Sequence, residues 1–484
     1  MPGNGGPLKH VAIRVLPLAL CLIGLLQSPV GASTAVFNVR DHDATGDGKT
    51  HDTAALNKAV EACAAAGGGQ VFFPAGKYLT GTVHLKSNVT VNLDAGAEIV
   101  GTSDLEQYQN FTPPGETPLA SRLRWHRALL LGVGVENVTI TGRGTINGNK
   151  VFDERGEERM RGPHAVLFGN SKNVTIRDVS IVDAANYAVM LEFTTHVDVR
   201  GVKITGGWDG VHFRGWKDNP CRDVSITDCQ FYTGDDCIAG WYWEDTLIAR
   251  CVINSSCNGI RLIGPAKNLV IHDCLFYGPG KFEHRTSRDK HRNNMLAGLC
   301  LQPGAWDRTE GVLDDVKVSN VTMHDVTTPL HFSVKEGNTV GRVTVDRLTA
   351  TGAYRAAASI ESWAKEPIGH VTLRDVSMEF TGGGTAEQAK AEVKSPGVDA
   401  RPLPAWGLYV RNVERLDLEN VRLTVANGDA RPVMIASGVG TLVLDDFRYP
   451  RAADGNEPLV LKDVREVRRV DPAGEPGVLR TPAK

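Results

Sequence analysis

The strongest constraint on the fold is a short motif of the type Asn-Val-Thr-Ile, which recurs along most of the chain. A polar residue comes first, and alternating apolar residues follow it. The motif begins at Asn88, Asn137, Asn173, His196, Asp223, Thr246, Asn268, Asp315, Arg342, His370, Arg415 and Thr441. From Asn173 to Asn268 the intervals are 23, 27, 23 and 22 residues. A period of this length, with two or three short strands in each unit, predicts an all-β parallel β-helix.

Longer intervals and irregular segments interrupt this period. We interpret the 47 residues from Asn268 to Asp315 as another turn plus an insertion, and the 45 residues from His370 to Arg415 as two turns. Residues 279–294 are rich in Lys and Arg, whereas residues 380–404 contain little apolar sequence. Both segments have the composition of loops outside the coil. One β-helix domain is therefore expected over residues 33–450.

The two ends of the chain differ from this domain. Residues 1–32 resemble an export signal, because basic Lys9 and Arg14 precede an apolar stretch, Val15–Leu26, that is too short to span a bilayer. We expect a secreted or periplasmic protein without stable membrane association once the signal is removed; an uncleaved anchor is the alternative. After about Tyr449 the motif fades, so residues 451–484 are expected to form a C-terminal cap or a disordered tail.

An amphipathic helix is predicted before the first repeats. Asp52 can cap it, and Gly67 to Gly69 end it. Its apolar residues recur at helical spacing at Ala55, Leu56, Ala59, Val60 and Cys63. Such a helix would cover the open end of a solenoid, whose core and strand edges would otherwise be exposed.

Charge and cysteine content exclude several functions. The formal net charge of -3 argues against a general nucleic-acid or membrane-surface binder. The nine cysteines show no CxxC spacing, so a zinc site is not expected. We also expect no other metal and no cofactor. Five of the cysteines recur at similar places in successive repeats: Cys229, Cys237, Cys251, Cys257 and Cys274. Stacked thiols that fill the core are favoured over disulfides, although export would permit disulfides.

Acidic residues recur at one place in the stretch from Trp208 to Gly264. Asp209, then Asp235 and Asp236, and then Asn258 each come before a short apolar run. If each repeat forms one turn of a coil, these residues become neighbours about 5 Å apart. We therefore expect three carboxyl groups to meet on one face.

The run GDG..HDTAALNKAV...GGGQVFFPAGKYLTGTVHLKS and the segment GDDCIA resemble glycoside hydrolase family 28, the polygalacturonases and rhamnogalacturonan hydrolases. The resemblance extends from about Val36 to the 440s and implies a single-stranded right-handed parallel β-helix. It also implies that Asp235 donates a proton while Asp209 and Asp236 activate water. The family's G-H-G is Cys257-Asn258-Gly259 in this chain, and no clear R-I-K motif follows.

These residues predict a monomeric, exported glycosidase that cleaves a pectic or other uronate-containing polysaccharide with inversion. Hydrolysis needs one protonated and one ionised carboxyl group. Because crowded carboxylates repel one another, we expect Asp235 to keep its proton. A polysaccharide lyase, which would use Ca²⁺ and a basic residue, and a non-catalytic carbohydrate-binding solenoid remain alternatives.

Four further residues are candidates for binding substrate. Asn258 could contact the sugar or only form a turn with positive φ. Arg261 could hold a carboxylate or form a surface ion pair, and Arg214 is a weaker candidate of the same kind. Trp241 could line a sugar cleft or only pack between loops and coil.

Overall fold

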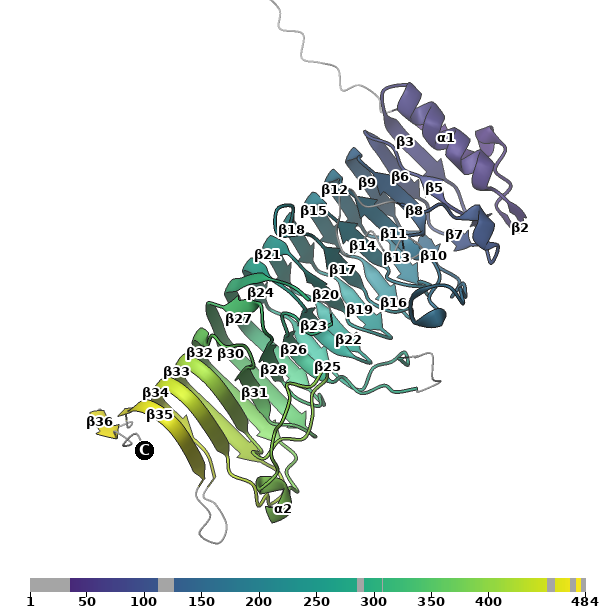
Figure 1. The fold of residues 1–484 in the computed structure, drawn as a ribbon. Coiled ribbons are helices and arrows are strands. Elements are labelled where there is room, and N and C mark those ends of the chain that lie inside the picture. The colour runs from purple at the N-terminus through teal and green to yellow at the C-terminus, as the bar shows by residue number, and fades with distance from the viewer. Residues whose placement is uncertain are drawn as a thin grey trace, which may run out of the picture. The chain divides into compact units, whose positions relative to one another are not determined.

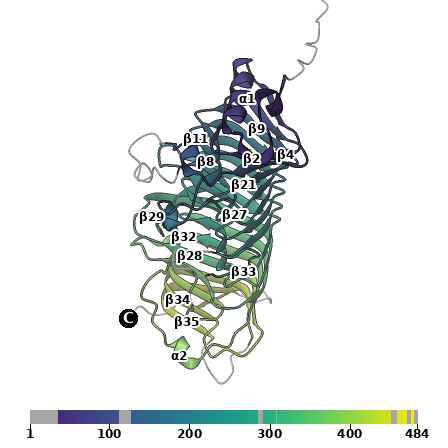
Figure 2. The same ribbon diagram turned by 90° about the vertical axis from the view of Figure 1, so that its right-hand side faces the viewer.

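The computed structural model describes residues 35–111, 126–284, 291–306, 308–450, 458–470 and 476–479. The rungs of a coil follow one another from α1 to β35 (Figures 1 and 2). Every named strand pair is parallel except β35 with β36. The predicted right-handed parallel β-helix is therefore confirmed. The predicted signal, residues 1–32, lies outside the described residues.

The strands form three ladders that run along the coil. The first ladder carries the recurring motif. It consists of β3 (Gly69–Phe73), β6 (Val89–Leu93), β9 (Glu136–Gly142), β12 (Lys172–Arg177), β15 (Thr195–Arg200), β18 (Cys221–Thr227), β21 (Trp243–Ala249), β24 (Ala266–His272), β27 (Gly311–His324), β30 (Arg342–Ala353), β32 (Ile368–Phe380), β33 (Leu408–Val425), β34 (Met434–Arg448) and β35 (Leu459–Val470). The short β1 (Val36–Asn38) pairs with β3 at its beginning.

The second ladder follows the first within each rung. It consists of β2 (Asp47–His51), β4 (Gly76–Thr80), β7 (Ala97–Gly101), β10 (Thr145–Asn147), β13 (Ser180–Val182), β16 (Lys203–Thr205), β19 (Gln230–Thr233), β22 (Val252–Ser255) and β25 (Leu275–Tyr277). From β27 onward each long strand continues from the first ladder into the second. The second half of β27, for example, pairs with β25.

The third ladder carries the candidate site. It consists of β5 (Val83–His84), β8 (Ala128–Val133), β11 (His164–Gly169), β14 (Val189–Glu192), β17 (Val211–Arg214), β20 (Ile238–Trp241), β23 (Asn258–Leu262), β26 (Ala297–Leu301), β28 (Leu330–Val334) and β31 (Ala358–Ser362). The short β29 (Asn338–Val340) pairs with the start of β27, and β36 (Pro476–Leu479) pairs with β35.

The core consists of columns in which one apolar residue of each rung lies on its equivalent in the next. One column of the first ladder is Ile140, Ile176, Val199, Ile226, Ile248, Ile271, Val318 and Val345. All of these side chains are buried. Period-two alternation places them inward, as the motif predicted.

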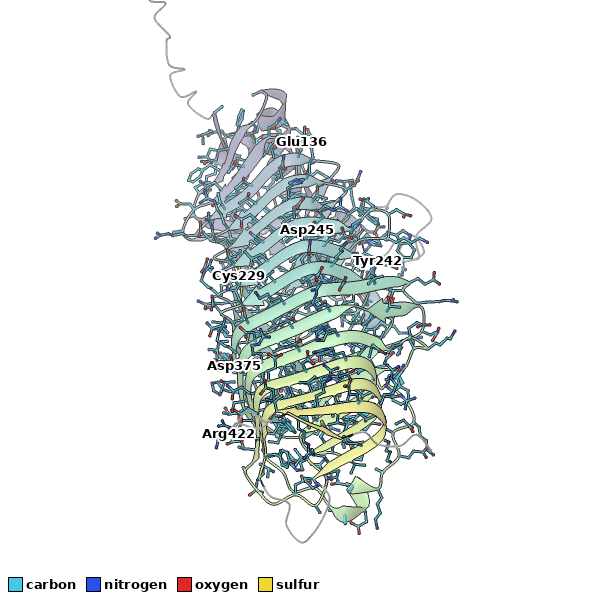
Figure 3. The ribbon with its side chains drawn as sticks, turned by 90° about the vertical axis from the view of Figure 1, so that its left-hand side faces the viewer. Glu136, Cys229, Tyr242, Asp245, Asp375 and Arg422 are labelled. Atoms are coloured by element: carbon cyan, nitrogen blue, oxygen red, sulfur yellow. The ribbon has the colours of Figure 1, made fainter. Side chains whose placement is uncertain are left out.

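The register corrects the predicted start of one repeat. Thr246 pairs with Val224 and Leu269, which are the second residues of their motifs. Asp245 (Figure 3) is the equivalent first residue, with a φ of 50°. Asp and Asn adopt this left-handed conformation more easily than most residues do, which explains why polar residues begin the motif as far as Asp315. The later starts, from Arg342 onward, do not have a positive φ.

Both interpretations of the long intervals were wrong. Leu269 pairs directly with Val316, and His370 pairs directly with Arg415. Each interval is therefore a single rung that carries a long insertion. Residues 381–407 form one insertion, which contains the short helix α2 (Ala386–Ala389). Period counting alone could not separate a second turn from a loop of equal length.

The predicted capping helix is α1 (Thr53–Ala65), which lies against β1 and β3. Leu56, Ala59, Val60 and Cys63 are buried, as their spacing predicted. Asp52 is at the N-cap position, but its side chain does not cap the helix. Its two oxygens instead accept hydrogen bonds from the backbone N–H groups of Thr45 and Gly46, at 2.7 and 3.0 Å.

At the other end the ladder extends beyond residue 450. β35 pairs in parallel with β34 along most of its length, so the coil continues to Val470, further than the fading motif indicated. β36 then pairs antiparallel to β35. No helix in the described parts of the chain is long and apolar enough to cross a membrane.

The thiols behave as the repeats predicted. All eight cysteines in the described residues are free and buried, and they include Cys229 (Figure 3). Cys229 and Cys251 each donate to a backbone carbonyl of the preceding rung, those of Val199 and Ile226. They fill the core as small side chains.

Candidate active site

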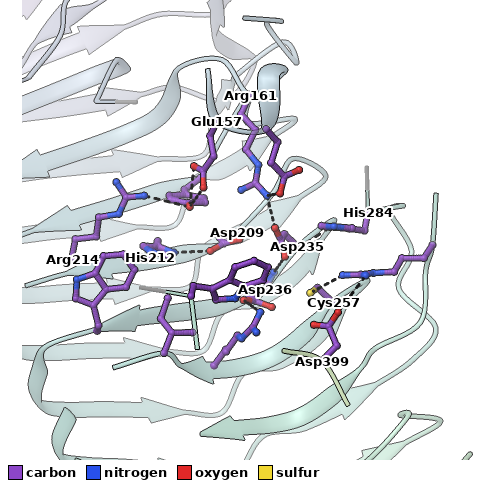
Figure 4. Close-up of a pocket in the computed structure, with 17 residues that line it drawn as sticks. Glu157, Arg161, Asp209, His212, Arg214, Asp235, Asp236, Cys257, His284 and Asp399 are labelled. Atoms are coloured by element: carbon purple, nitrogen blue, oxygen red, sulfur yellow. Dashed lines mark hydrogen bonds and ion pairs between the residues drawn. The ribbon is translucent and has the colours of Figure 1, made fainter. Parts of the chain in front are cut away.

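The three predicted aspartates meet in one pocket of about 410 Å³ (Figure 4). Asp209 lies in the turn two residues before β17 begins, and Asp235 and Asp236 lie in the turn three and two residues before β20 begins. Because β17 and β20 pair in register, with Val211 beside Ile238, equivalent turns lie on adjacent rungs. Asn258 begins β23 on the next rung, where its side chain contacts Asp236 rather than the pocket itself.

Asp235 forms an ion pair with Arg161, a residue that the sequence analysis did not identify. Arg161 Nη2 donates to Asp235 Oδ2 at 2.7 Å, and both side chains are buried. His284 Nδ1 lies 3.8 Å from the other carboxylate oxygen. Burial alone would raise the pKa of Asp235, but electrostatic interactions with His284 and Arg161 outweigh it and hold this pKa well below its usual value.

Asp209 has a different environment. Its Oδ2 lies 2.6 Å from His212 Nδ1, and the His212 ring stacks on Tyr187 with 4.2 Å between centroids. Burial, with repulsion from Asp235 and Asp236, raises the pKa of Asp209 well above its usual value. Burial and the nearby arginines lower the pKa of His212 well below its usual value, so the imidazole is neutral.

Asp236 is held by hydrogen bonds from Asn258. The backbone N–H and Nδ2 of Asn258 donate to Asp236 Oδ1 at 3.0 and 2.8 Å. Arg261 Nη1 lies 3.6 Å from Oδ2. Burial raises the pKa of Asp236, and repulsion from Asp235 adds to it, against the lowering effect of Arg261.

The order of the three pKa values therefore differs from the order that crowding of the carboxyl groups alone would predict. We expected Asp235 to stay protonated, but its pKa is lowered, whereas those of Asp209 and Asp236 are raised. The reason is the pair of neighbours His284 and Arg161, which favour the Asp235 carboxylate and were not part of the sequence argument. Among the three aspartates, the ionised form is thus more favoured at Asp235 than at Asp209 or Asp236.

The candidate binding residues are more deeply buried than expected. Arg261 is not a surface ion pair, since it donates to Gln302 Oε1 at 2.8 and 3.1 Å and to the carbonyl oxygen of Val398 at 3.1 Å. Arg214 is buried and lies 3.7 Å from Glu192. Asn258 does not have a positive φ, which removes the turn alternative. Contacts inside the protein therefore hold the side chains of Arg261, Arg214 and Asn258 in place.

Aromatic side chains form part of the pocket wall. Trp241 contacts the edge of His212, with 5.7 Å between ring centroids, and the Arg214 guanidinium lies 5.7 Å from the Trp241 ring. Trp306 also lines the pocket and is 62% exposed. Trp208 lies under the Arg161 guanidinium at 3.9 Å. Of these three, Trp306 is the exposed one and can face a sugar.

Asp235, Asp236 and Cys257 could offer three ligand atoms to a metal ion, all within 4.8 Å of one another. Their chemistry does not favour one. Arg161 lies 2.7 Å from Asp235 and Arg261 lies 3.6 Å from Asp236, so a cation is already close to each of the two carboxyl groups. Burial, with the two aspartates, raises the pKa of Cys257 well above its usual value, so its thiol is not the thiolate that binds metals.

Sequence reasoning missed the residues that insertions bring into the pocket. Glu157, Glu158 and Arg161 come from the insertion between β10 and β11, and Asp399 comes from the insertion between β32 and β33. Arg292, from the predicted basic loop, donates to Cys257 Sγ at 3.2 Å. Part of that loop, residues 285–290, lies outside the described residues. The interval of 36 residues from Asn137 to Asn173 was the one available signal of the first insertion.

Comparison with known proteins agrees with this architecture. Residues 36–281, more than half of the chain, match the family described as rhamnogalacturonase A/epimerase, pectate lyase-like. A probable polygalacturonase from Vitis vinifera is 28% identical over 217 residues, which cover 42% of this chain and only 44% of that protein. An exopolygalacturonase from Zea mays is 22% identical over 372 residues, which cover 72% of this chain and 84% of that protein.

A solved structure, that of a hyperthermoactive exopolygalacturonase from Thermotoga maritima, has the same fold. Its TM-score is 0.57 at 20% identity, and the match covers 80% of this chain and 91% of that one. The chain therefore belongs to the rhamnogalacturonase A/epimerase family of pectate-lyase-like proteins and resembles the polygalacturonases of glycoside hydrolase family 28.

Proposed function

We propose that this protein is a glycosidase that hydrolyses a pectic or other uronate-containing polysaccharide with inversion. The observation that carries the proposal is the set of three carboxyl groups in one pocket with pKa values shifted in opposite directions. Hydrolysis of a glycosidic bond requires this combination of a protonated and an ionised carboxyl group. The relatives named polygalacturonase and exopolygalacturonase support the choice of substrate.

In the proposed mechanism Asp209 is the acid and Asp235 is the base. Asp235 accepts a proton from a water molecule, whose oxygen attacks the anomeric carbon. The bond from that carbon to the leaving oxygen breaks, and the proton of Asp209 passes to this oxygen. Asp236, held by Asn258, is positioned to orient the water. The product carries the inverted anomeric configuration because a single displacement has occurred.

This assignment exchanges the roles of Asp209 and Asp235. The family resemblance implies that Asp235 donates the proton and that Asp209 activates water. Asp235 was the expected donor, but Arg161 at 2.7 Å favours its ionised form. Among the described residues, His212 is the one basic side chain within ion-pair distance of Asp209, and its imidazole is held neutral. Neutral His212 can accept a hydrogen bond from protonated Asp209 at Nδ1, which stabilises the acid form.

The test is a product analysis on a panel of pectic and other acidic glycans. We expect new reducing ends, and proton NMR recorded within the first turnovers should show the inverted anomer. Retention of configuration would contradict the mechanism. A product that absorbs near-ultraviolet light through a new double bond would instead identify a lyase. Binding across the panel without any released sugar would identify a non-catalytic solenoid.

We also propose that the chain is exported to the cell exterior or periplasm, where such polysaccharides are met. The basic and then apolar composition of residues 1–32 supports this proposal. The protein isolated from its own cells should begin directly after residue 32 by intact-mass measurement. A full-length chain in the cytoplasmic fraction would contradict export.

A further inference from the structure

One buried carboxylate near the candidate active site takes no part in the proposed chemistry. Glu192 is the last residue of β14, its side chain is fully buried, and it does not line the pocket. An isolated carboxylate is costly to bury, so such a group needs cations beside it. Glu192 Oε1 lies 2.8 Å from His126 Nδ1 and 3.7 Å from Arg214 Nη1. Of these two partners, Arg214 is the one that lines the pocket.

The register of the third ladder brings Glu192 and Arg214 together. Glu192 pairs with Arg214 on the next rung, so both side chains leave the same face of the ladder. Burial alone would lower the pKa of Arg214. Burial is outweighed by Tyr187, Glu192 and Glu157, which raise this pKa above its usual value. The guanidinium is therefore charged, and among the described residues Glu192 is the one carboxylate within ion-pair distance of it.

Arg214 connects Glu192 to the side chain that holds Asp209. Arg214 Nη2 donates to the Tyr187 hydroxyl at 3.5 Å, and the guanidinium lies 5.5 Å from the centroid of the Tyr187 ring. The Tyr187 ring stacks on His212, with 4.2 Å between centroids and 8° between planes. His212 Nδ1 in turn lies 2.6 Å from Asp209 Oδ2 (Figure 4). A shift of Arg214 would therefore disturb the ring against which His212 packs.

Stability is a weak explanation for the pair of Glu192 and Arg214. Apolar residues of similar volume often replace a buried ion pair without loss of stability. The Arg214 cation acts on the site instead, because it adds to burial in lowering the pKa of His212. A neutral His212 can accept a hydrogen bond from protonated Asp209. Arg214 thus has to be charged and fixed in place, and Glu192 favours both.

We propose that Glu192 is a positioning residue of the proposed reaction, which acts through its counter-ion Arg214. Glu192 holds the guanidinium against Tyr187. The stack of Tyr187 on His212 then keeps the Asp209 carboxyl group in the orientation from which it protonates the leaving oxygen. This inference rests on the proposed function, in which Asp209 is the acid. It assigns Arg214 to positioning rather than to binding a substrate carboxylate.

The kinetic test compares Glu192→Gln, Arg214→Met and the double variant on polygalacturonate. Each single variant should lower kcat by about 10- to 100-fold with little change in KM, because the acid is misplaced while the substrate still binds. The double variant should lose no more than Arg214→Met, since both changes break the same link. On a nitrophenyl galacturonide, whose leaving group needs little protonation, all losses should be smaller.

The matched control is Glu244→Gln. It breaks a pair with Arg222 that also joins adjacent rungs, at 3.0 Å, but lies at the surface. This variant should keep full activity. A melting transition shows whether each variant is folded. If Glu192→Gln does not fold, the double variant, which removes both charges together, is compared with Arg214→Met in its place.

A second readout does not depend on turnover. In the unliganded protein, the short hydrogen bond between Asp209 and His212 should give a downfield proton resonance, which labelling of the histidine nitrogens identifies. The resonance should be present in the unaltered protein and in Glu244→Gln. It should be broadened or lost in Glu192→Gln and in Arg214→Met.

The outcomes separate this inference from the proposed function. Losses that multiply in the double variant, or a raised KM with unchanged kcat in Arg214→Met, would overturn the positioning role. Equal losses on both substrates, full activity in Glu192→Gln, or a resonance absent from the unaltered protein or kept in Glu192→Gln would also overturn it. If the unaltered protein cleaves neither substrate, the hydrolase proposal loses its support, whereas the resonance still tests whether Glu192 positions His212.

Discussion

Arg161 Nη2 lies 2.7 Å from Asp235 Oδ2, although 74 residues separate them in the chain. Arg161 belongs to the insertion between β10 and β11, whereas Asp235 lies in the turn three residues before β20 begins. The same guanidinium stacks on Trp208 and lies 3.2 Å from Glu158. The pKa of Asp235 therefore depends in part on a loop from an earlier rung, and not only on its own repeat.

Replacing Arg161 should shift the pH dependence of activity. Asp235 works as a base only while ionised, so its activity is present above its pKa and lost as pH falls through that value. Without the cation this pKa rises, and the acidic limb of the kcat/KM profile for Arg161→Gln should move upward by about 1–3 pH units. Arg155→Gln, in the same insertion, should leave the limb in place. An unmoved limb in Arg161→Gln would remove Arg161 from the mechanism.

Substrates with different leaving groups should separate the acid from the base. An aryl glycoside with a good leaving group needs little protonation, so Asp209→Asn should lose much less activity on it than on the polysaccharide. Asp235→Asn should lose activity on both substrates, by about 10²-fold or more. The opposite pattern would restore Asp235 as the acid. Asp315→Asn, at an exposed turn with a φ of 49°, is the matched control and should keep full activity.

The same two variants should move the melting temperature in opposite directions. The pKa of Asp209 is raised in the folded state, so the free energy of unfolding falls as the pH rises above the pKa that this group has in the unfolded chain. Asp209→Asn removes this loss of stability and should raise the Tm at pH 7. Asp235→Asn removes the nearer of the two carboxylates that pair with buried Arg161, which leaves Glu158 as the other, and should lower the Tm. Calorimetric scans at pH 7 and pH 4 check both, and the gain in Asp209→Asn should shrink at pH 4.

The fold could be predicted because its information is local and repeated. Each rung places a polar residue at a positive φ and apolar residues such as Val224 and Ile226 in the same columns. The alternation and the period are visible in the sequence between the insertions. Where the period failed, at the intervals of 45 and 47 residues, an insertion had the length of an extra rung. Only strand pairing could distinguish them.

The site was predictable only in part, for a related reason. Asp209, Asp235 and Asp236 lie in the repeat itself, so stacking brings them together. Arg161 and Asp399 lie in insertions, whose paths depend on tertiary contacts that leave no periodic signal. The low pKa of Asp235 depends on Arg161, which lies in an insertion, so the repeat alone could not predict it.

The insertion of residues 381–407 offers a test of how loops shape the pocket. Its Val398 carbonyl oxygen accepts hydrogen bonds from Arg261 and from Gln302, at 3.1 and 2.9 Å. It is anchored by Arg401, whose two Nη atoms donate to the buried carboxylate of Glu361 at 3.2 and 2.8 Å.

Arg401→Met should release this insertion from the coil. Breaking a buried pair on one side costs about 3–5 kcal/mol, because Glu361 is left without its main cation. We expect faster trypsin cleavage at exposed Lys390 and Lys394 and a raised KM, since Val398 no longer holds Arg261 in place. Arg374→Met breaks an exposed pair with Glu419 and should change neither quantity, because such pairs contribute about 0–1 kcal/mol. Unchanged cleavage and KM in Arg401→Met would show that other contacts hold the insertion.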